Sequence, residues 1–469
     1  MHSSPKQGFL VVLLLCSISL QSCGVVVRGI RSGVDKFRNS ERFHQGRHGA
    51  LTEQELGWAR IAWAYFDANY NPETGLVNAL DGVPTTSMWQ VGDTLAALHV
   101  AFELDFLSRD QFDERISTLL SFLNTMPLFG GQLPNRYYHT KTEQMTNFRN
   151  EPQAVGWSAI DIGRLLIWLA TIAERYPQYT EYIHKVILRW SFCDIVDDCG
   201  SLYAGNHIDD RLELVQEGRL GYEEYAAMGF RVWGFDTRRA SLLEPYDRIP
   251  IYGVEVLHDG RDPRETGTFA PVVSLPFLLL GMEFNWDQVD DRSSRDSRHT
   301  DPLLANQADR VYQVQEERYL QEGIFTARTD HPLEGPPYFV YDSIFAAGYP
   351  WNTIADTGQE FPDAALVATR AVFPMWALYR RPYTATLLEV ICPILDPRRG
   401  FYEGRRERTG GWETVLSATT NAMVLEALLY KQEGKLFQGT RKGHLQILLA
   451  DEFRRPQRCY PADRERCAP

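Results

Sequence analysis

The sequence has none of the short motifs that would settle its chemistry outright. Its 469 residues contain no Walker loop, no GxGxxG, no HExxH and no GxSxG, which argues against nucleotide-binding, zinc-protease and serine-hydrolase functions. Long basic runs are also missing, and 48 basic side chains face 61 acidic ones, a formal charge of -13. Phosphate binding needs a basic footprint, so nucleic acid is not expected as a partner.

Cysteine is scarce as well, with seven in the whole chain. Their spacing is not that of a zinc site, and we predict neither a metal nor a cofactor. Two close pairs, Cys193 with Cys199 and Cys459 with Cys467, are candidate small-loop disulfides of an exported protein. Cys392 lies in an apolar run and is expected to be a buried thiol.

The N-terminal segment predicts export. Lys6 precedes a mostly apolar run over residues 9–20, which is too short to remain as a membrane-spanning anchor. The run ends in LQSCG (20–24), which resembles the lipobox of bacterial lipoproteins, and in that class Cys23 would be acylated. We therefore predict a lipoprotein signal peptide over 1–22, a flexible tether over 23–50, and anchoring in the outer membrane, facing the periplasm. The alternative is an ordinary secretory signal with an incidental cysteine.

The composition favours a folded domain with a neutral polar ligand. Hydrophobic residues make up 44% of the chain and aromatic residues 12%, enough for a sizeable core. No Pro/Gly/Ser linker divides the chain beyond residue 50, so 51–469 is expected to be one domain with a C-terminal extension from about 435. An acidic groove with many aromatic side chains suits an oligo- or polysaccharide.

A short glycine motif recurs along the chain: TGLVN (74–78), GQLPN (131–135), GSLYA (200–204), GIFTA (323–327) and GFYEG (400–404). Each copy follows an amphipathic helical pattern and precedes a helix of small and apolar residues. The widest interval contains a further apolar run at 272–280, which completes six helical hairpins. We therefore predict an all-α fold, an (α/α)6 toroid with long loops at one mouth. The expected inner helices are 85–103, 153–174, 221–234, 271–284, 359–380 and 414–431; the alternative is a large α-helical domain without closed symmetry.

Acidic and aromatic residues recur near the start of the expected inner helices, where a toroid would bring them to one mouth. Sugar chemistry needs this mixture, because aromatic faces stack on pyranose rings and two carboxyl groups serve as acid and as base or nucleophile. The stretch 217–236 carries the densest group. The candidate catalytic residues are Glu223, Glu224 and Asp161, with Asp93 and Glu403 in reserve; the candidate substrate-binding residues are Trp89, Trp157, Arg164, Arg219, Tyr222, Tyr341 and Tyr402.

Each candidate has a structural alternative. Asp161 and Arg164 are three residues apart and could form a helix-surface or interhelix ion pair. Tryptophans are more often core than sugar platform. Glu223 and Glu224 would point about 100° apart on a helix, so one is expected to face the cavity while the other packs or caps. A carboxylate at a helix N-terminus keeps its charged form, which suits a base or nucleophile.

Several of these blocks also resemble a known family. They are TGLVN (74–78), LPN (133–135), GWSAIDIGRLL (156–166), the stretch 217–236, IYGV (251–254), PYFVY (337–341) and residues 421–430. From Trp58 to roughly Gly434 the chain resembles the bacterial domain of unknown function 3131, which is described as glucoamylase-like. The resemblance implies an (α/α)6-like fold related to glucan-acting toroids and an exported location, without an assigned reaction.

One departure from the family pattern affects the functional hypothesis. Where the family would have SEPYxLDG, this chain has SLPFLLLG (274–281), so Leu275 and Leu280 replace two acids. Our leading hypothesis is a glycoside hydrolase or transglycosylase that acts on a periplasmic or extracellular glucan or exopolysaccharide. The alternatives are a non-catalytic glycan-binding or polysaccharide-assembly lipoprotein, which the two leucines favour, and a scaffold without oligosaccharide affinity.

Overall fold

The structure is a computed structural model that describes residues 46–439, apart from 210, 218, 219, 244, 262–269, 290 and 292–298. Four residues of the predicted sites lie outside the described residues: the lipidation site Cys23, the substrate-binding candidate Arg219, and the paired cysteines Cys459 and Cys467.

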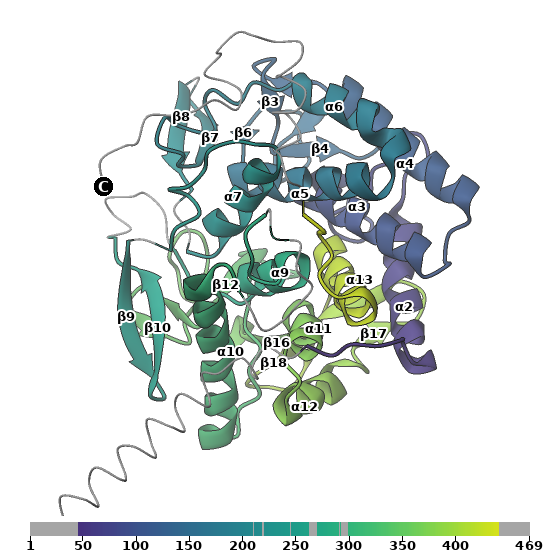
Figure 1. Ribbon diagram of the computed structural model, residues 1–469. Helices are drawn as coiled ribbons and strands as arrows, with labels where there is room; N and C mark the ends of the chain where they lie inside the picture. The colour runs from purple at the N-terminus through teal and green to yellow at the C-terminus, as the bar shows by residue number, and fades with distance from the viewer. Residues whose placement is uncertain are drawn as a thin grey trace, which may run out of the picture.

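Six mostly buried helices form the centre of the molecule: α3 (Met88–Glu103), α5 (Ala159–Arg175), α7 (Tyr222–Val232), α9 (Leu275–Phe284), α11 (Thr369–Leu378) and α13 (Ala418–Glu433). Each packs against the next in this order, and α13 packs against α3, so the order closes (Figure 1). Small residues permit the closest approach. A Cβ added to Gly229 would lie 2.1 Å from the carbonyl oxygen of Gly163, which shows how tightly α5 and α7 meet. Every predicted inner segment overlaps one of these helices, and their C-terminal ends agree to within two residues.

Five further helices cover this group: α2 (Glu53–Asn69), α4 (Arg109–Thr125), α6 (Thr180–Leu188), α10 (Pro302–Glu322) and α12 (Pro382–Ile391). α2 packs on α13 and α3, α4 on α3, α6 on α5, α10 on α9 and α12 on α11. The predicted capping box at the start of the first is present, because Thr52 accepts from the Glu55 amide at 3.3 Å and Glu55 accepts from the Thr52 amide at 2.7 Å.

The predicted all-α class is wrong, because the described residues are 43% helix and 21% strand, a mixed α/β structure with several small sheets. The sheets are antiparallel. They contain β1 (Thr85–Ser87), β4 (Tyr137–His139) and β5 (Met145–Thr146); β2 (Leu128–Phe129) and β3 (Leu133–Pro134); β6 (Gly156–Trp157), β7 (Tyr203–Ile208) and β8 (Arg211–Gln216); β9 (Tyr246–Ile251) and β10 (Val254–Asp259); β11 (His331–Pro332), β12 (Phe339–Asp342) and β15 (Thr353–Ile354); β13 (Phe345–Ala346) and β14 (Tyr349–Pro350); and β16 (Leu366–Ala368), β17 (Leu395–Asp396), β18 (Gly400–Arg406) and β19 (Trp412–Leu416). Two short 3₁₀ helices, η1 (Pro177–Tyr179) and η2 (Pro362–Ala364), complete the description.

The strands were missed for a physical reason. Most span only two or three residues, which is too short to produce the alternation of apolar and polar side chains that identifies a strand. The longer strand β8 has the sequence RLELVQ, which begins with alternating charged and apolar residues, so here a strand signal was present and was overlooked.

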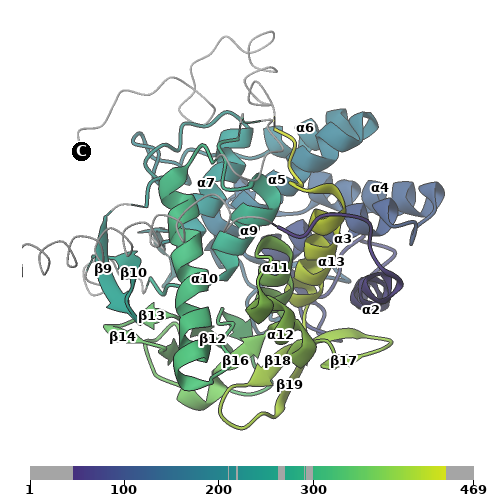
Figure 2. The same ribbon diagram turned by 60° about the horizontal axis from the view of Figure 1, so that its bottom comes forward.

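Many strands lead directly into the central helices. β1 is followed directly by α3, and β16 directly by α11. A single residue separates β6 from α5 and β19 from α13. Figure 2 shows β12, β16, β18 and β19 gathered at one end of the molecule, near α11 and α13. Side chains at the first turns of neighbouring helices also bond to each other, as Gln90 does to Thr419 at 3.4 Å. The N-terminal ends of the central helices therefore meet on the strand-rich side, which we call the mouth.

Two cysteine predictions can be compared with the structure. Cys193 and Cys199 are both disulfide-bonded, as predicted. Cys392 is a free cysteine, but its side chain is only partly buried, because it caps the exposed C-terminal end of α12.

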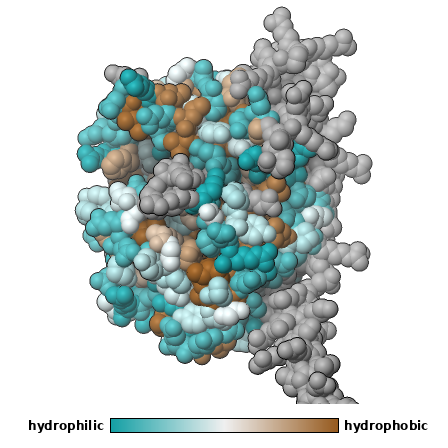
Figure 3. Space-filling view, turned by 90° about the vertical axis from the view of Figure 1, so that its left-hand side faces the viewer, coloured by the Kyte–Doolittle hydropathy of each residue, from teal (hydrophilic) through white to brown (hydrophobic). Residues whose placement is uncertain are grey.

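The surface is of mixed character. On the face shown in Figure 3, which corresponds to the side of hairpin β9–β10 in Figure 1, hydrophobic residues are interspersed with hydrophilic ones. Among the described residues, the helices lack the combination of length and hydrophobicity that would let one cross a bilayer.

Candidate functional site

Asp161 is the best-placed carboxylate at the mouth. It lies in the first turn of α5, and its side chain accepts hydrogen bonds from Ser87 at 2.9 Å and from Ser158, the N-cap, at 3.2 Å. The residue is partly accessible to solvent. Burial within the surrounding walls nonetheless raises the pKa of Asp161 to about 6, against the lowering effect of Ser87 and the Arg136 charge. A carboxyl group of this kind is partly protonated near neutral pH and reachable by a ligand.

Two tyrosines accompany Asp161. Tyr137 on β4 and Tyr341 on β12 are both partly exposed, and Tyr341 was a predicted substrate-binding residue. Burial raises the pKa of Tyr137; the Arg136 charge lowers it, and the charges of Asp161, Tyr341 and Asp356 raise it, so each of these three groups acts electrostatically on Tyr137. The mouth thus combines a carboxyl group with aromatic rings, the mixture expected of a sugar site.

A second carboxylate, Asp330, was not among the predicted site residues. The Tyr222 hydroxyl donates to it, as does the Thr329 hydroxyl at 2.9 Å, and Arg370 on α11 donates to its main-chain carbonyl at 3.3 Å. Burial, and then the Asp330 charge, raise the pKa of Tyr222 well above its ordinary value. Tyr222, a predicted substrate-binding residue, therefore points to Asp330.

One sequence signal could have identified Asp330. It comes three residues after the glycine motif at 323–327, which marks an entrance to the mouth. It is also next to Thr329, whose hydroxyl accepts from the amide of Leu275 at 3.3 Å. Asp330 therefore brings a carboxylate close to the position where the leucine replaces an acid.

Glu223 and Glu224 divide their roles, as expected for adjacent helical residues, but neither is freely exposed. Glu224 accepts from the amide of Gly221 at 2.5 Å and so caps α7. Glu223 accepts from Gln216 at 2.9 and 3.0 Å. Burial raises the pKa of Glu223 to about 8, and that of Glu224 well above its ordinary value. Desolvation thus outweighs the helix dipole, contrary to the expectation of a charged base.

Asp93 and Arg164 are not at the mouth but at the fully buried centre of the ring. Arg164, fully buried, donates to Asp93 at 2.7 Å, to Glu283 on α9 at 3.0 Å, to Glu426 on α13 at 2.6 Å and to the Tyr225 hydroxyl on α7 at 2.7 Å. Arg164 thus forms an ion pair between helices, but with Asp93 rather than Asp161. Burial raises the pKa of Asp93 and Glu283 and, most strongly, that of Glu426. We call these five residues the Arg164 network; it has no access for a substrate.

Two other candidates, Glu403 and Trp157, are also part of the interior. Glu403 has no exposed surface, and Arg370, Ser417 and Thr420 saturate its oxygens. Trp157 is a core residue whose indole nitrogen donates to the carbonyl of Tyr203 at 3.0 Å.

Trp89 packs between Tyr222, with ring centroids 5.8 Å apart, and the guanidinium of Arg164, 5.0 Å from the indole centroid. It therefore connects the mouth with the Arg164 network. Tyr402 remains partly exposed, on β18, with the half-exposed Trp412 at 6.4 Å. Among the described residues, no group of three or more His, Cys, Asp or Glu side chains is arranged to hold a metal ion.

Solved structures share this fold. A glucoamylase-like protein from Bacteroides caccae is 13% identical, with a TM-score of 0.58 over 85% of this chain and 98% of that one. An endo-β-1,2-glucanase from Chitinophaga pinensis, in complex with sophorotriose and glucose, is 14% identical, with a TM-score of 0.59 over 86% of this chain and 98% of that one. At these identities the likeness shows a shared fold and nothing about the reaction.

The search of curated proteins gives no match. The model of the DUF3131 family, described as a protein of unknown function, matches residues 57–434. The chain therefore belongs to the DUF3131 family, as its sequence blocks predicted.

Proposed function

We propose that this protein is a glycoside hydrolase or transglycosylase that acts on a glucan, with Asp161 as its acid. The observation that carries the proposal is a partly accessible carboxyl group, with its pKa raised to about 6, in a mouth lined by tyrosines. A general acid must hold its proton near the working pH and still reach the glycosidic oxygen.

Asp330 supplies the second carboxyl group of this mechanism, although its residue is buried, with 7% of its surface exposed. Asp161 would donate its proton to the oxygen of the scissile bond, so that the leaving sugar departs as an alcohol. Asp330, oriented by Tyr222 and Thr329, would assist at the anomeric carbon, as nucleophile or by deprotonating the attacking water. Asp161 and Asp330 thus remain available although Leu275 and Leu280 replace two acids of the family pattern.

The fold suggests the first substrates to test. The similar structures include endo-β-1,2-glucanases and glucoamylase-like proteins, so linear β-1,2-glucan and α-1,4-glucan come before other polymers. Reducing ends released by the wild-type chain are compared with those released by Asp161→Asn and Asp330→Asn. We expect each substitution to lower the rate about a hundredfold or more, since general acid–base groups contribute about 10²–10⁴. Asp110→Asn on the exposed surface of α4 is the matched control.

A glycan-binding protein without turnover is the second candidate, favoured by the apolar start of α9 at Leu275. Calorimetry separates the two functions. Oligosaccharide binding with no product after days would support the binding protein, and unchanged activity in both carboxylate variants would remove Asp161 and Asp330 from the mechanism. Absence of both binding and turnover would favour the scaffold.

We also propose that Cys23 carries a lipid that holds the protein at the outer membrane. The proposal is supported by the lipobox-like segment at 20–24. Metabolic labelling with palmitate should mark the wild-type protein and leave Cys23→Ala unlabelled; equal labelling of both would contradict it.

A further inference from the structure

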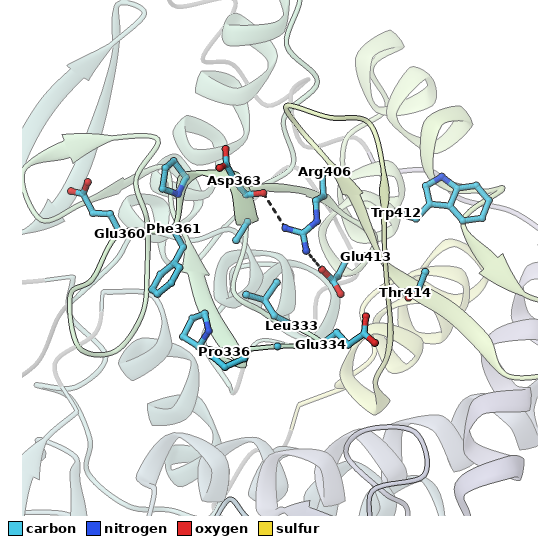
Figure 4. Close-up of a pocket in the computed structure, with 14 residues that line it drawn as sticks. Leu333, Glu334, Pro336, Glu360, Phe361, Asp363, Arg406, Trp412, Glu413 and Thr414 are labelled. Atoms are coloured by element: carbon cyan, nitrogen blue, oxygen red, sulfur yellow. Dashed lines mark hydrogen bonds and ion pairs between the residues drawn. The ribbon is translucent and has the colours of Figure 1, made fainter.

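A cavity of about 740 Å³ opens between η2, the β11–β12 segment and the strands β18 and β19 (Figure 4). Its volume lies in the range of about 300–1,000 Å³ that is usual for ligand sites. Leu333, Val340 and Ala364, with Phe361 packed against them, form a small apolar cluster there that is separate from the main core. The cavity thus has its own packed floor.

The polar side of the cavity is formed by Arg406, which two bonds hold in place. Arg406 donates to the main-chain carbonyl of Asp363 at 3.0 Å and pairs with the carboxylate of Glu413, as Figure 4 shows. Glu413 is only 3% exposed, so the pair is held firmly in the wall. The indole of Trp412 lies on the other side of β19 and does not enter this side of the cavity.

The charge of the lining restricts the ligand. Glu334, Glu360, Asp363 and Glu413 are acidic, whereas Arg406 is the basic member of the lining. A phosphate or uronic acid would be repelled by this excess. The rings of Phe361 and Pro336 lie across the cavity from Arg406 and offer an apolar face. An apolar face opposite fixed hydrogen-bonding groups suits a neutral sugar.

The cavity is also close to the mouth. Leu333, in its floor, is three residues after Asp330. An extended chain spans at most about 3.3–3.6 Å per residue, so the two Cα atoms are within about 11 Å. This distance is short enough for one oligosaccharide to span both Asp330 and the floor of the cavity.

We propose that this cavity is a second sugar subsite, which holds an uncharged glucan chain beyond the units that occupy the mouth. The inference rests on the proposed function in assuming a glucan, and adds that the protein recognises chains rather than disaccharides. Phe361 would stack on a pyranose ring, and Glu334 and the Arg406–Glu413 pair would bond its hydroxyl groups.

The test uses the full chain carrying Asp161→Asn, so that ligands are not consumed. Calorimetric titrations with the β-1,2-linked disaccharide and with a chain of about six units are repeated after adding Phe361→Ala. We expect the affinity for the longer chain to fall about tenfold, the effect of losing one aromatic contact, while that for the disaccharide stays the same. Tyr182→Ala, an exposed tyrosine on α6, is the matched control. Glu334→Gln, also exposed, is a second variant in case Phe361→Ala fails to fold, and should weaken only the longer chain.

The outcomes separate the two proposals. The subsite proposal would be overturned if Phe361→Ala lowered the affinity for both lengths equally, or for neither. It would also be overturned if only glucosamine oligomers bound, because they are positively charged rather than neutral. Binding that depends on length and on Phe361, in a wild-type chain that never cleaves glucan, would keep the subsite and reject the hydrolase. Cleavage of glucan at a rate that Phe361→Ala does not change, for every chain length, would keep the hydrolase and reject the subsite.

Discussion

Two groups of polar residues occupy the same ring of helices, and α5 contributes to both. Asp161 at the mouth is partly exposed and bonded to neutral hydroxyl groups, whereas Arg164, three residues later, is fully buried and bonded to three carboxylates. Both regions have carboxyl groups of raised pKa. A raised pKa therefore does not distinguish a chemical group from a structural one; access for a ligand does.

The largest effect is expected from removing the cation of the buried group. Arg164→Met should destabilise the protein by about 3–5 kcal/mol, because it leaves buried carboxylates without their partner. Urea unfolding measures this difference. Arg238→Met, on an exposed side chain paired with Asp236, is the control and should leave stability nearly unchanged, because water screens an exposed ion pair. Equal effects in the two variants would mean that the Arg164 network does not stabilise the ring.

A smaller effect, on pH dependence, is expected at the mouth. If Asp161 is the acid, kcat/KM should fall about tenfold per pH unit as the pH rises above about 6. Its raised pKa also has a stability consequence. Between its unfolded pKa, about 3.8, and about 6 the folded state keeps a proton that the unfolded state has lost, so this group lowers the free energy of unfolding as the pH rises through that window.

Asp161→Asn should remove this pH-dependent part of the stability, and unfolding between about pH 4 and 7 in both chains measures it. A slope that is identical with and without Asp161 would show that its pKa is not raised.

The smallest effect on stability and activity is expected at Glu224. The sequence placed this residue at the mouth, but its carboxylate caps the N-terminus of α7. An amide oxygen can still accept from Gly221, so Glu224→Gln should lower the free energy of unfolding by about 1 kcal/mol and leave activity within about a factor of two. Thermal unfolding and a rate assay on the same sample check this. A large loss of activity at unchanged stability would move Glu224 into the catalytic group.

The helical part of the fold could be predicted because its signals are local. The run 271–284 is apolar and the run 414–431 is rich in small and apolar residues, and the helices α9 and α13 overlap them. The strands at the mouth depend on pairing between distant segments, as β16 pairs with β18, and two or three residues carry too little pattern to reveal it.

The site was predictable only in part for the same reason. Asp161 was identified because an acid at the start of a central helix tends to reach the mouth. Arg164 and Asp93 also lie near the start of a central helix. Whether such a side chain points to the mouth or to the centre of the ring depends on the neighbouring helices, which here supply Glu283 and Glu426. Asp330 lies on a connecting segment, where position along a helix gives no information.

The close contact of Gly163 with α7 has a consequence for engineering. Gly163 lies between Asp161 and Arg164, on the part of α5 that cannot move away from α7 without losing backbone contact. The candidate acid and the anchor of the ring therefore move as one rigid body. Mutations near the centre that raise heat resistance should also change the pKa of Asp161. Mutations that change the pH optimum should in turn alter heat resistance. The two properties would therefore be difficult to evolve separately in this protein.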